Sequence, residues 1–142
     1  MTEIRDRIKT KINLIQIDNQ KIFDLKYEIG LYFTCFNDEY DYDTVKLYNA
    51  LANVLIKVSK CLKDDSFKQD ALECFDEAIR LNDSKNPIYL VERGKLHIEM
   101  GNKDLAIVDV NTINELPEDW KTDSINGTYV KLALESIIKS CT

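Results

Sequence analysis

The sequence contains little glycine and proline, and this scarcity is the first indication of its fold. Four glycines and two prolines occur in 142 residues. Both residue types interrupt helices and mark turns, so a chain with few of them favours long helices over many short strands. No segment alternates apolar and polar residues over the length of a strand, whereas apolar residues recur at three- and four-residue spacing. We therefore predict an all-α protein.

Cysteine and long apolar runs are also scarce, which bears on the compartment. The four cysteines form no C-x-x-C pair, which argues against a zinc site and against dithiol redox chemistry. Each cysteine fits an apolar position of a helix, as expected in a reducing compartment. The amino end is too charged for a signal peptide, and no apolar run approaches the roughly 18 residues of a membrane helix. The predicted localisation is cytoplasmic, without membrane association.

Positive charge is in the minority, and this limits the partners. Lysine and arginine number 19 against 25 acidic residues, which gives a net charge of −6. Binding to a nucleic acid requires a positive patch that displaces counterions, and the few arginines do not cluster. We therefore expect no nucleic-acid partner. A cationic or mixed-charge polypeptide is easier to accommodate.

The apolar spacing and the residues that cap helices predict seven helices. The first carries an apolar stripe of Ile4, Ile8, Ile12 and Ile15, and the others cover about 21–36, 44–62, 66–82, 87–101, 103–116 and 127–140. Asp41 or Asp43 can cap the third helix, and Ser66 with Gln69 has the form of a capping box for the fourth. Asn86 precedes a proline at the start of the fifth helix, and Gly101 suits the end of that helix.

The second half of the chain contains an internal repeat. Aligning the sequence with itself at an offset of 35 residues places Ala71 on Ala106. The same offset aligns five further pairs of mostly small or apolar residues: Leu55 with Leu90, Ser59 with Gly94, Phe75 with Val110, Ala78 with Ile113 and Leu81 with Leu116. A fixed period of this size is typical of arrays of helical hairpins, in which each pair buries its apolar side only by stacking on its neighbours.

Residues 87–117 resemble a tetratricopeptide repeat. They have a small residue at Gly94, a planar one at His97, a turn glycine at Gly101 and an alanine at Ala106. The preceding repeat matches mainly in its second half. The resemblance implies a stack of antiparallel helix hairpins in a single domain, residues 1–142. Its predicted parts are degenerate amino-terminal helices at 1–51, two repeat units at 52–86 and 87–120, and a capping helix at 121–142.

The resemblance also implies a function. In this family the first helices of successive units line a concave groove that receives peptides. Carried over by register, the partner-binding positions are Tyr27, Leu31, Asn53, Ile56, Lys60, Ile88, Val91, Lys95 and Ile98. We therefore expect a protein–protein interaction module, an adaptor or scaffold, whose partner is another protein or peptide.

Other readings of the sequence remain open. The chain could be a dedicated chaperone or inhibitor of one client protein, or it could form a homodimer through its aromatic helix at about 21–36, which is apolar on more than one face. Arg93 could bind a partner's carboxylate or an internal acid, and Trp120 could be a binding hot spot or fold back onto the stack. We expect no enzyme, no metal and no cofactor, because the single histidine, His97, has no nucleophile or second ligand beside it.

Overall fold

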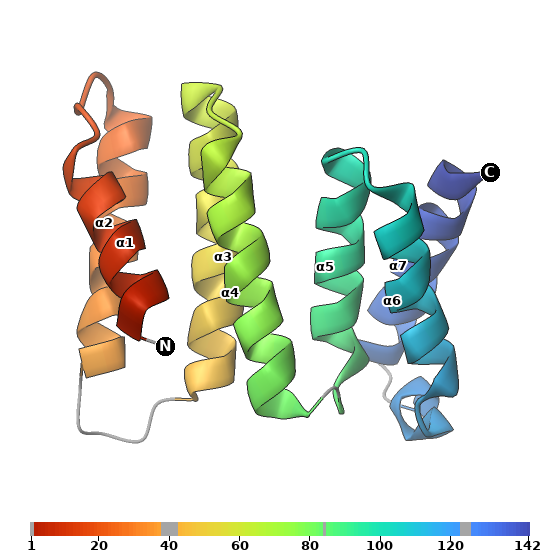
Figure 1. The fold of residues 1–142 in the computed structure, drawn as a ribbon. Coiled ribbons are helices and arrows are strands. Elements are labelled where there is room, and N and C mark those ends of the chain that lie inside the picture. Colours follow the sequence, from red (N-terminus) through yellow and green to blue (C-terminus); the bar gives the residue numbers. More distant parts are fainter. Residues whose placement is uncertain (1, 38–42, 84, 123–125) are drawn as a thin grey trace. The chain divides into compact units, whose positions relative to one another are not determined.

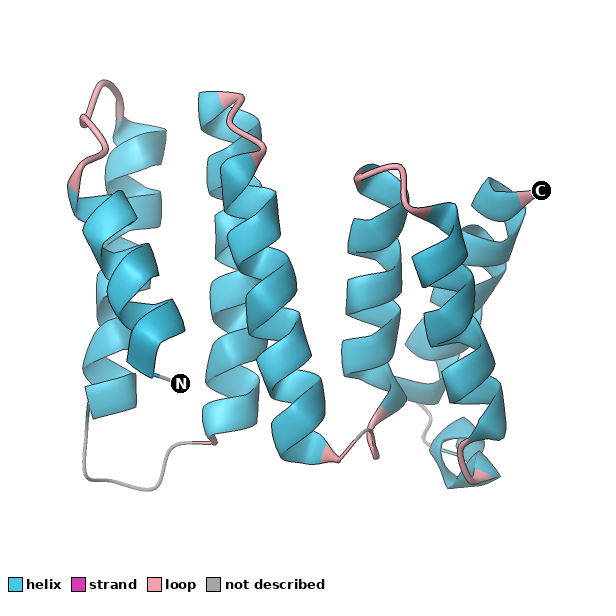
Figure 2. Ribbon diagram, in the orientation of Figure 1, coloured by secondary structure: helices cyan, strands magenta, loops and turns pink. Residues whose placement is uncertain are grey.

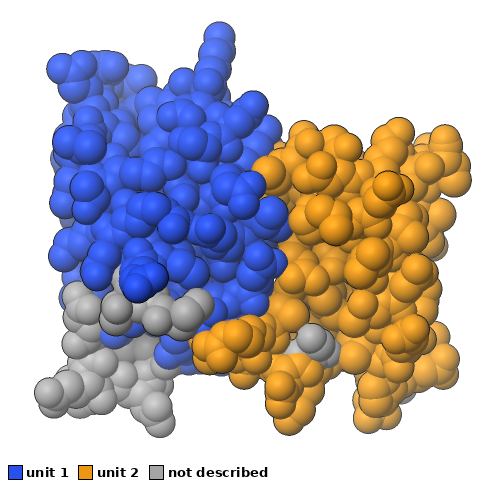
Figure 3. Space-filling view, in the orientation of Figure 1, with its two compact units in different colours: residues 1–78 blue, residues 79–142 orange. Residues whose placement is uncertain are grey.

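The part of the chain that the structure describes is predominantly helical. The computed structural model describes residues 2–37, 43–83, 85–122 and 126–142. Within these ranges the chain forms seven α-helices and one short 3₁₀ helix, without any strand (Figures 1 and 2). The all-α class is therefore confirmed. The chain divides into two compact units, residues 1–78 and 79–142 (Figure 3). The predicted division into repeat units and a cap stays a prediction.

Unit 1 holds three helices and most of a fourth: α1 (Thr2–Asn13), α2 (Gln20–Asn37), α3 (Thr44–Leu62) and α4 (Ser66–Asn82), which continues past the unit boundary. The predicted bounds of α3 and α4 are confirmed. Helix α1 ends earlier than its apolar stripe indicated. Ile8 and Ile12 are buried, whereas Ile15 lies beyond the helix in the connection to α2.

Aspartate side chains determine where α3 and α4 begin. The carboxylate of Asp43 accepts a hydrogen bond from the backbone N–H of Lys46 at 3.3 Å, which confirms one of the two predicted caps. The other, Asp41, lies outside the described residues. At α4 the carboxylate of Asp64 accepts a hydrogen bond from the backbone N–H of Ser66 at 2.9 Å, so Asp64 takes the capping role predicted for Ser66. Hydrogen bonds from Ser66 lower the pKa of Asp64, because they favour its charged form.

Contacts between side chains show which helices of unit 1 lie together. Lys11 on α1 donates a hydrogen bond to the Asp70 carboxylate on α4 at 2.5 Å, and its ammonium group lies 4.2 Å from the centre of the Phe67 ring. The rings of Phe36 on α2 and Tyr48 on α3 have centroids 4.8 Å apart. Helix α1 therefore packs beside α4, and α2 packs beside α3 (Figure 1).

Unit 2 begins within α4 and contains α5 (Pro87–Glu99), α6 (Lys103–Glu115), the 3₁₀ helix η1 (Glu118–Thr122) and α7 (Asn126–Cys141). The three α-helices that follow α4 all pack on one another. The predicted cap of α5 is confirmed, since the side chain of Asn86 accepts a hydrogen bond from the N–H of Ile88 at 3.0 Å. Gly101 has a φ of +79°, a conformation that is unfavourable for a residue with a Cβ atom, and it lies in the turn directly after α5, which ends at Glu99. The sequence did not predict η1.

The 35-residue register is matched by burial. Both members are buried in five of the six aligned pairs, including Ala71 with Ala106, and only Leu81 with Leu116 departs from this pattern. A Cβ atom on Gly94 would lie 3.9 Å from the carbonyl oxygen of Ala106 and 3.2 Å from Cδ1 of Ile137. The predicted close approach of α5 and α6 at Gly94 is therefore confirmed.

Candidate functional site

The predicted groove positions in unit 2 do not form an open floor. Val91 has no exposed surface, and Ile88 is half-buried. Ile98 packs against a buried cluster of Ala106, Val110 and Ile137 from α6 and α7. The predicted role of Val91 and Ile98 in partner binding stays a prediction, although Val91 is buried and Ile98 is half-buried. Ile98 packs on this cluster because helix α7 returns to pack on α5 and α6.

The fourth predicted position in unit 2, Lys95, is exposed but engaged by α7. Its ammonium group donates a hydrogen bond to the Tyr129 hydroxyl at 3.0 Å, and that hydroxyl donates in turn to the carboxylate of Glu92. Burial acts to lower the pKa of Lys95, but the hydrogen bond to Tyr129 and the charges of Glu92 and Glu99 outweigh it and raise the pKa. Lys95 is therefore a charged link between α5 and α7.

Arg93 and His97 also turn inward. The guanidinium group of Arg93 donates hydrogen bonds to both carboxylate oxygens of Asp109, at 3.1 Å to Oδ2 and 2.6 Å to Oδ1. The Asp109 side chain is 1% exposed, and Nε2 of His97 lies 3.9 Å from it. Of the two alternatives for Arg93, the structure shows pairing with an internal acid. His97 is a buried core residue.

Trp120 lies in η1 and is half-buried. The ammonium group of Lys121 lies 5.7 Å from the centre of a Trp120 ring. The backbone carbonyl oxygen of Trp120 would come within 2.6 Å of a Cβ atom on Gly127, so η1 and the start of α7 are in close contact. This partial burial fits a side chain that folds back onto the protein better than a fully exposed hot spot.

The predicted positions in unit 1 differ in exposure. Asn53 and Ile56 on α3 are half-buried, and the Asn53 amide donates a hydrogen bond to the backbone carbonyl of Asn49 at 3.0 Å. Lys60, near the end of α3, is exposed. Tyr27 and Leu31 on α2 are exposed as well. The largest apolar surface among the predicted positions therefore lies on α2.

Helix α2 carries apolar side chains on two opposite sides. One side is buried and contains Ile22, Leu25, Ile29 and Phe33. The other side, which we call the α2 stripe, consists of Phe23, Tyr27 and Leu31, exposed by 46%, 63% and 49%. The rings of Phe23 and Tyr27 stack with centroids 6.4 Å apart. A row of large exposed apolar side chains is typical of an interaction surface.

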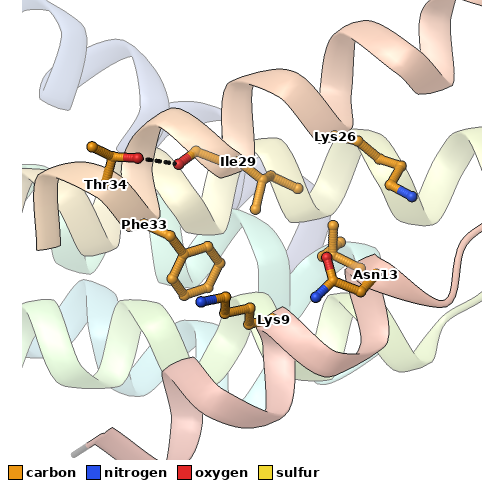
Figure 4. A pocket seen from close by; sticks show the side chains of 8 residues that line it. Lys9, Asn13, Lys26, Ile29, Phe33 and Thr34 are labelled. Atoms are coloured by element: carbon orange, nitrogen blue, oxygen red, sulfur yellow. Dashed lines mark hydrogen bonds between the residues drawn. The ribbon is translucent and has the colours of Figure 1, made fainter. Parts of the chain in front are cut away.

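A pocket adjoins the α2 stripe between α1 and α2. It has a volume of about 290 Å³, and we call it the α1–α2 pocket. Its walls are apolar at Ile12, Ile29 and Phe33. Figure 4 shows Lys9 reaching from α1 towards Phe33, with Lys26 at the other end. The described residues that line the pocket include two lysines and no carboxylate, so the local charge is opposite in sign to that of the whole chain.

Gly30 lies on the wall of the α1–α2 pocket without a structural need for glycine. A Cβ atom at this position would meet nothing within 4 Å, and its φ lies outside the positive range. Gly94, by contrast, is enclosed by α6 and α7. Glycine inside a helix costs about 0.5–1 kcal/mol relative to alanine. Gly30 therefore weakens α2 without any packing gain within the described chain.

The sequence did not identify Lys9, Lys26 and Gly30 as members of one site. Phe23 falls in the aromatic helix predicted at about 21–36, but the sequence did not single it out as a binding residue. The one signal available was spacing: Phe23, Tyr27 and Leu31 recur every four residues, on the side of the helix opposite Ile22 and Ile29. Proximity to Lys9 depends on how α1 packs, and a single sequence does not give that arrangement.

Within residues 2–37, 43–83, 85–122 and 126–142, no three His, Cys, Asp or Glu side chains gather as metal ligands. In the same ranges, no helix combines the length and apolarity needed to cross a lipid bilayer. Comparisons of the chain with protein-family models, with curated proteins and with solved structures found no match. The resemblance to tetratricopeptide repeats therefore stays a prediction, and function has to be argued from the surface.

Proposed function

We propose that this protein is an interaction module that binds a segment of another polypeptide through the α2 stripe and the α1–α2 pocket. The observation that carries the proposal is the exposure of Phe23, Tyr27 and Leu31 in one row on α2. The opposite side of the same helix is buried, so the row is not needed for the core of unit 1. Covering large apolar side chains is favourable, and aromatic residues dominate many binding hot spots.

The helical architecture supports this class of function. Paired helices with buried positions at a 35-residue offset agree with a hairpin array, and such arrays present extended surfaces to other proteins. Of the groove positions implied by the tetratricopeptide resemblance, the proposed surface keeps Tyr27 and Leu31 on α2. In unit 2, Val91 is buried and Ile98 is half-buried against a core cluster. We therefore assign partner binding to the amino-terminal helices. The protein would act as an adaptor or as the chaperone of one client.

A different polypeptide is favoured over a second copy of this chain by charge. The pocket beside the stripe is lined by Lys9 and Lys26 without a carboxylate among the described lining residues. In a twofold dimer built on this surface, the same lysines of two copies would approach each other, which is unfavourable. Self-association remains a measurable alternative.

Affinity capture with matched variants tests the proposal. The bait is the full chain, as wild type, as Tyr27→Asp/Leu31→Asp, and as Leu132→Asp. Leu132 is a suitable control because it is an exposed leucine, at 61%, in the other unit. Since all three side chains are exposed, we expect thermal midpoints close to that of the wild type.

We expect a partner recovered by the wild type and by Leu132→Asp to be lost with Tyr27→Asp/Leu31→Asp. Equal recovery by all three baits would reject the α2 stripe as the binding surface. Light scattering of the same proteins provides the second readout. A wild-type dimer that dissociates in Tyr27→Asp/Leu31→Asp would instead assign the stripe to self-association.

A further inference from the structure

The exposed side of α2 has the spacing of a helix-packing seam. Phe23, Tyr27, Gly30 and Thr34 are separated by four, three and four residues, and all four are exposed. This alternation is the one by which a helix presents a continuous row to a second helix lying along it. The occupant best suited to this row is therefore a helix rather than an extended strand.

Gly30 and Thr34 make one end of this seam low, in that no large side chain protrudes from the helix there. Gly30 has no Cβ atom, and the Thr34 hydroxyl is turned back to donate a hydrogen bond to the Gly30 carbonyl at 3.1 Å (Figure 4). Small residues in a helix face allow the backbone of another helix to approach closely. Gly30, which weakens α2 when no partner is bound, gives room for such an approach.

The α1–α2 pocket opens beside this low end. At about 290 Å³ it is at the lower limit of the pockets that hold small-molecule ligands, and its apolar walls suit one large aliphatic or aromatic side chain. A helix lying on Phe23, Tyr27 and Gly30 could place one such side chain into the pocket. Helix-in-groove recognition commonly uses this combination of a helical ridge and a buried anchor.

The charged side chains at the pocket determine which sign of charge the ligand should carry. The ammonium group of Lys26 is held in place by a hydrogen bond of 2.8 Å to the backbone carbonyl of Ile15. Lys9 is exposed on α1 and lines the same pocket. Since the whole chain carries a net charge of −6, an acidic segment would be repelled by most of the surface and attracted here.

We propose that the partner segment is an acidic amphipathic helix that lies along Phe23, Tyr27 and Gly30. One apolar side chain of this helix fills the α1–α2 pocket, and carboxylates beside it pair with Lys9 and Lys26. This inference rests on the proposed function, because it specifies the ligand of the same surface. It also reverses the expectation, drawn from net charge, of a cationic partner.

A displayed library of helical peptides tests the chemistry of the ligand. Every member carries leucines at the seam positions and random residues beside them, and selection uses the full-length protein as target. We expect the flanking positions to become enriched in Asp and Glu. Enrichment in Lys and Arg, or an unchanged composition, would overturn the inference, as would equal selection on Tyr27→Asp/Leu31→Asp.

Three variants then locate the selected peptide by fluorescence anisotropy. Gly30→Ala should raise the urea midpoint of the protein and still weaken peptide binding about tenfold, because the added methyl group occupies the space of the approaching helix. A merely structural role for Gly30 would not separate the two readouts in this way. Lys9→Glu should weaken binding about tenfold, and the matched control Lys21→Glu should have little effect, since Lys21 is an exposed lysine of α2 that does not line the pocket.

Equal effects of Lys9→Glu and Lys21→Glu would reject the charge pairing, and wild-type affinity in Gly30→Ala would reject the close approach. The proposed function is rejected by a different result from those that reject the acidic helix. It fails when partner capture is insensitive to Tyr27→Asp/Leu31→Asp. Capture that depends on Tyr27 and Leu31 but not on Gly30 and Lys9 would keep the interaction surface and remove the acidic helix.

Discussion

Replacing Arg93 by methionine should destabilise unit 2 more than any surface substitution. Arg93 pairs with both oxygens of Asp109, and the Asp109 side chain is 1% exposed, whereas that of Arg93 is 22% exposed. Methionine keeps the length of the side chain and leaves the carboxylate buried without its cation. Removing one member of a buried ion pair costs about 3–5 kcal/mol. We expect a loss of this size in the free energy of unfolding.

Because the Arg93 side chain is more exposed than that of Asp109, replacing one or the other should cost different amounts of stability. Asp109→Leu should cost less than Arg93→Met, because the partly exposed guanidinium group can turn towards water. The double variant Arg93→Met/Asp109→Leu should be more stable than Arg93→Met alone, since an apolar pair can replace a buried ion pair at little cost. Urea unfolding followed by circular dichroism measures all three variants. A cost below about 1 kcal/mol for Arg93→Met, or a double variant no more stable than that single one, would refute this reasoning.

Three further predictions follow from other sites. Gly127→Ala should lower stability by about 1–3 kcal/mol in thermal unfolding, because its Cβ atom would come within 2.6 Å of the Trp120 carbonyl oxygen; an unchanged midpoint would contradict this. Cys74 is fully buried, and burial raises the pKa of its thiol, so alkylation followed by peptide mass spectrometry should label the half-buried Cys35, Cys61 and Cys141 first and Cys74 only on unfolding. Burial, and then a hydrogen bond to Glu28, raise the pKa of Tyr32 to about 12, so the folded state favours its neutral phenol. The contribution of this raised pKa to the free energy of unfolding should be fully present below about pH 10 and fall as the pH rises towards 12. In urea titrations at alkaline pH, Tyr32→Phe should make that fall less steep.

Much of the fold could be predicted because local chemistry fixes the ends of the helices. Asp43 and Asn86 cap the helices that follow them, and Gly101 adopts a positive φ where α5 ends. The repeat register likewise identified buried positions such as Ala71 and Ala106. These features depend on residues close in sequence or on a regular period, so a single sequence displays them.

The candidate site could be predicted only in part, because exposure depends on packing between distant segments. Val91 and Tyr27 both occupy apolar helix positions, yet Val91 is buried and Tyr27 is 63% exposed. Gly30 and Gly94 are both glycines inside helices. Helices α6 and α7 enclose Gly94, whereas nothing lies within 4 Å of a Cβ atom on Gly30. Sequence spacing cannot distinguish these cases.

Site-specific photo-crosslinking in the native host tests the central claim most directly. A photoreactive phenylalanine analogue replaces Tyr27 in one protein and Leu132 in another, both being exposed positions on different units. We predict that the analogue at position 27 captures one other polypeptide, that the analogue at 132 does not, and that mass spectrometry places the adduct on an acidic helical segment. Crosslinks from position 27 only to a second copy of this chain, or identical products from both positions, would contradict the claim.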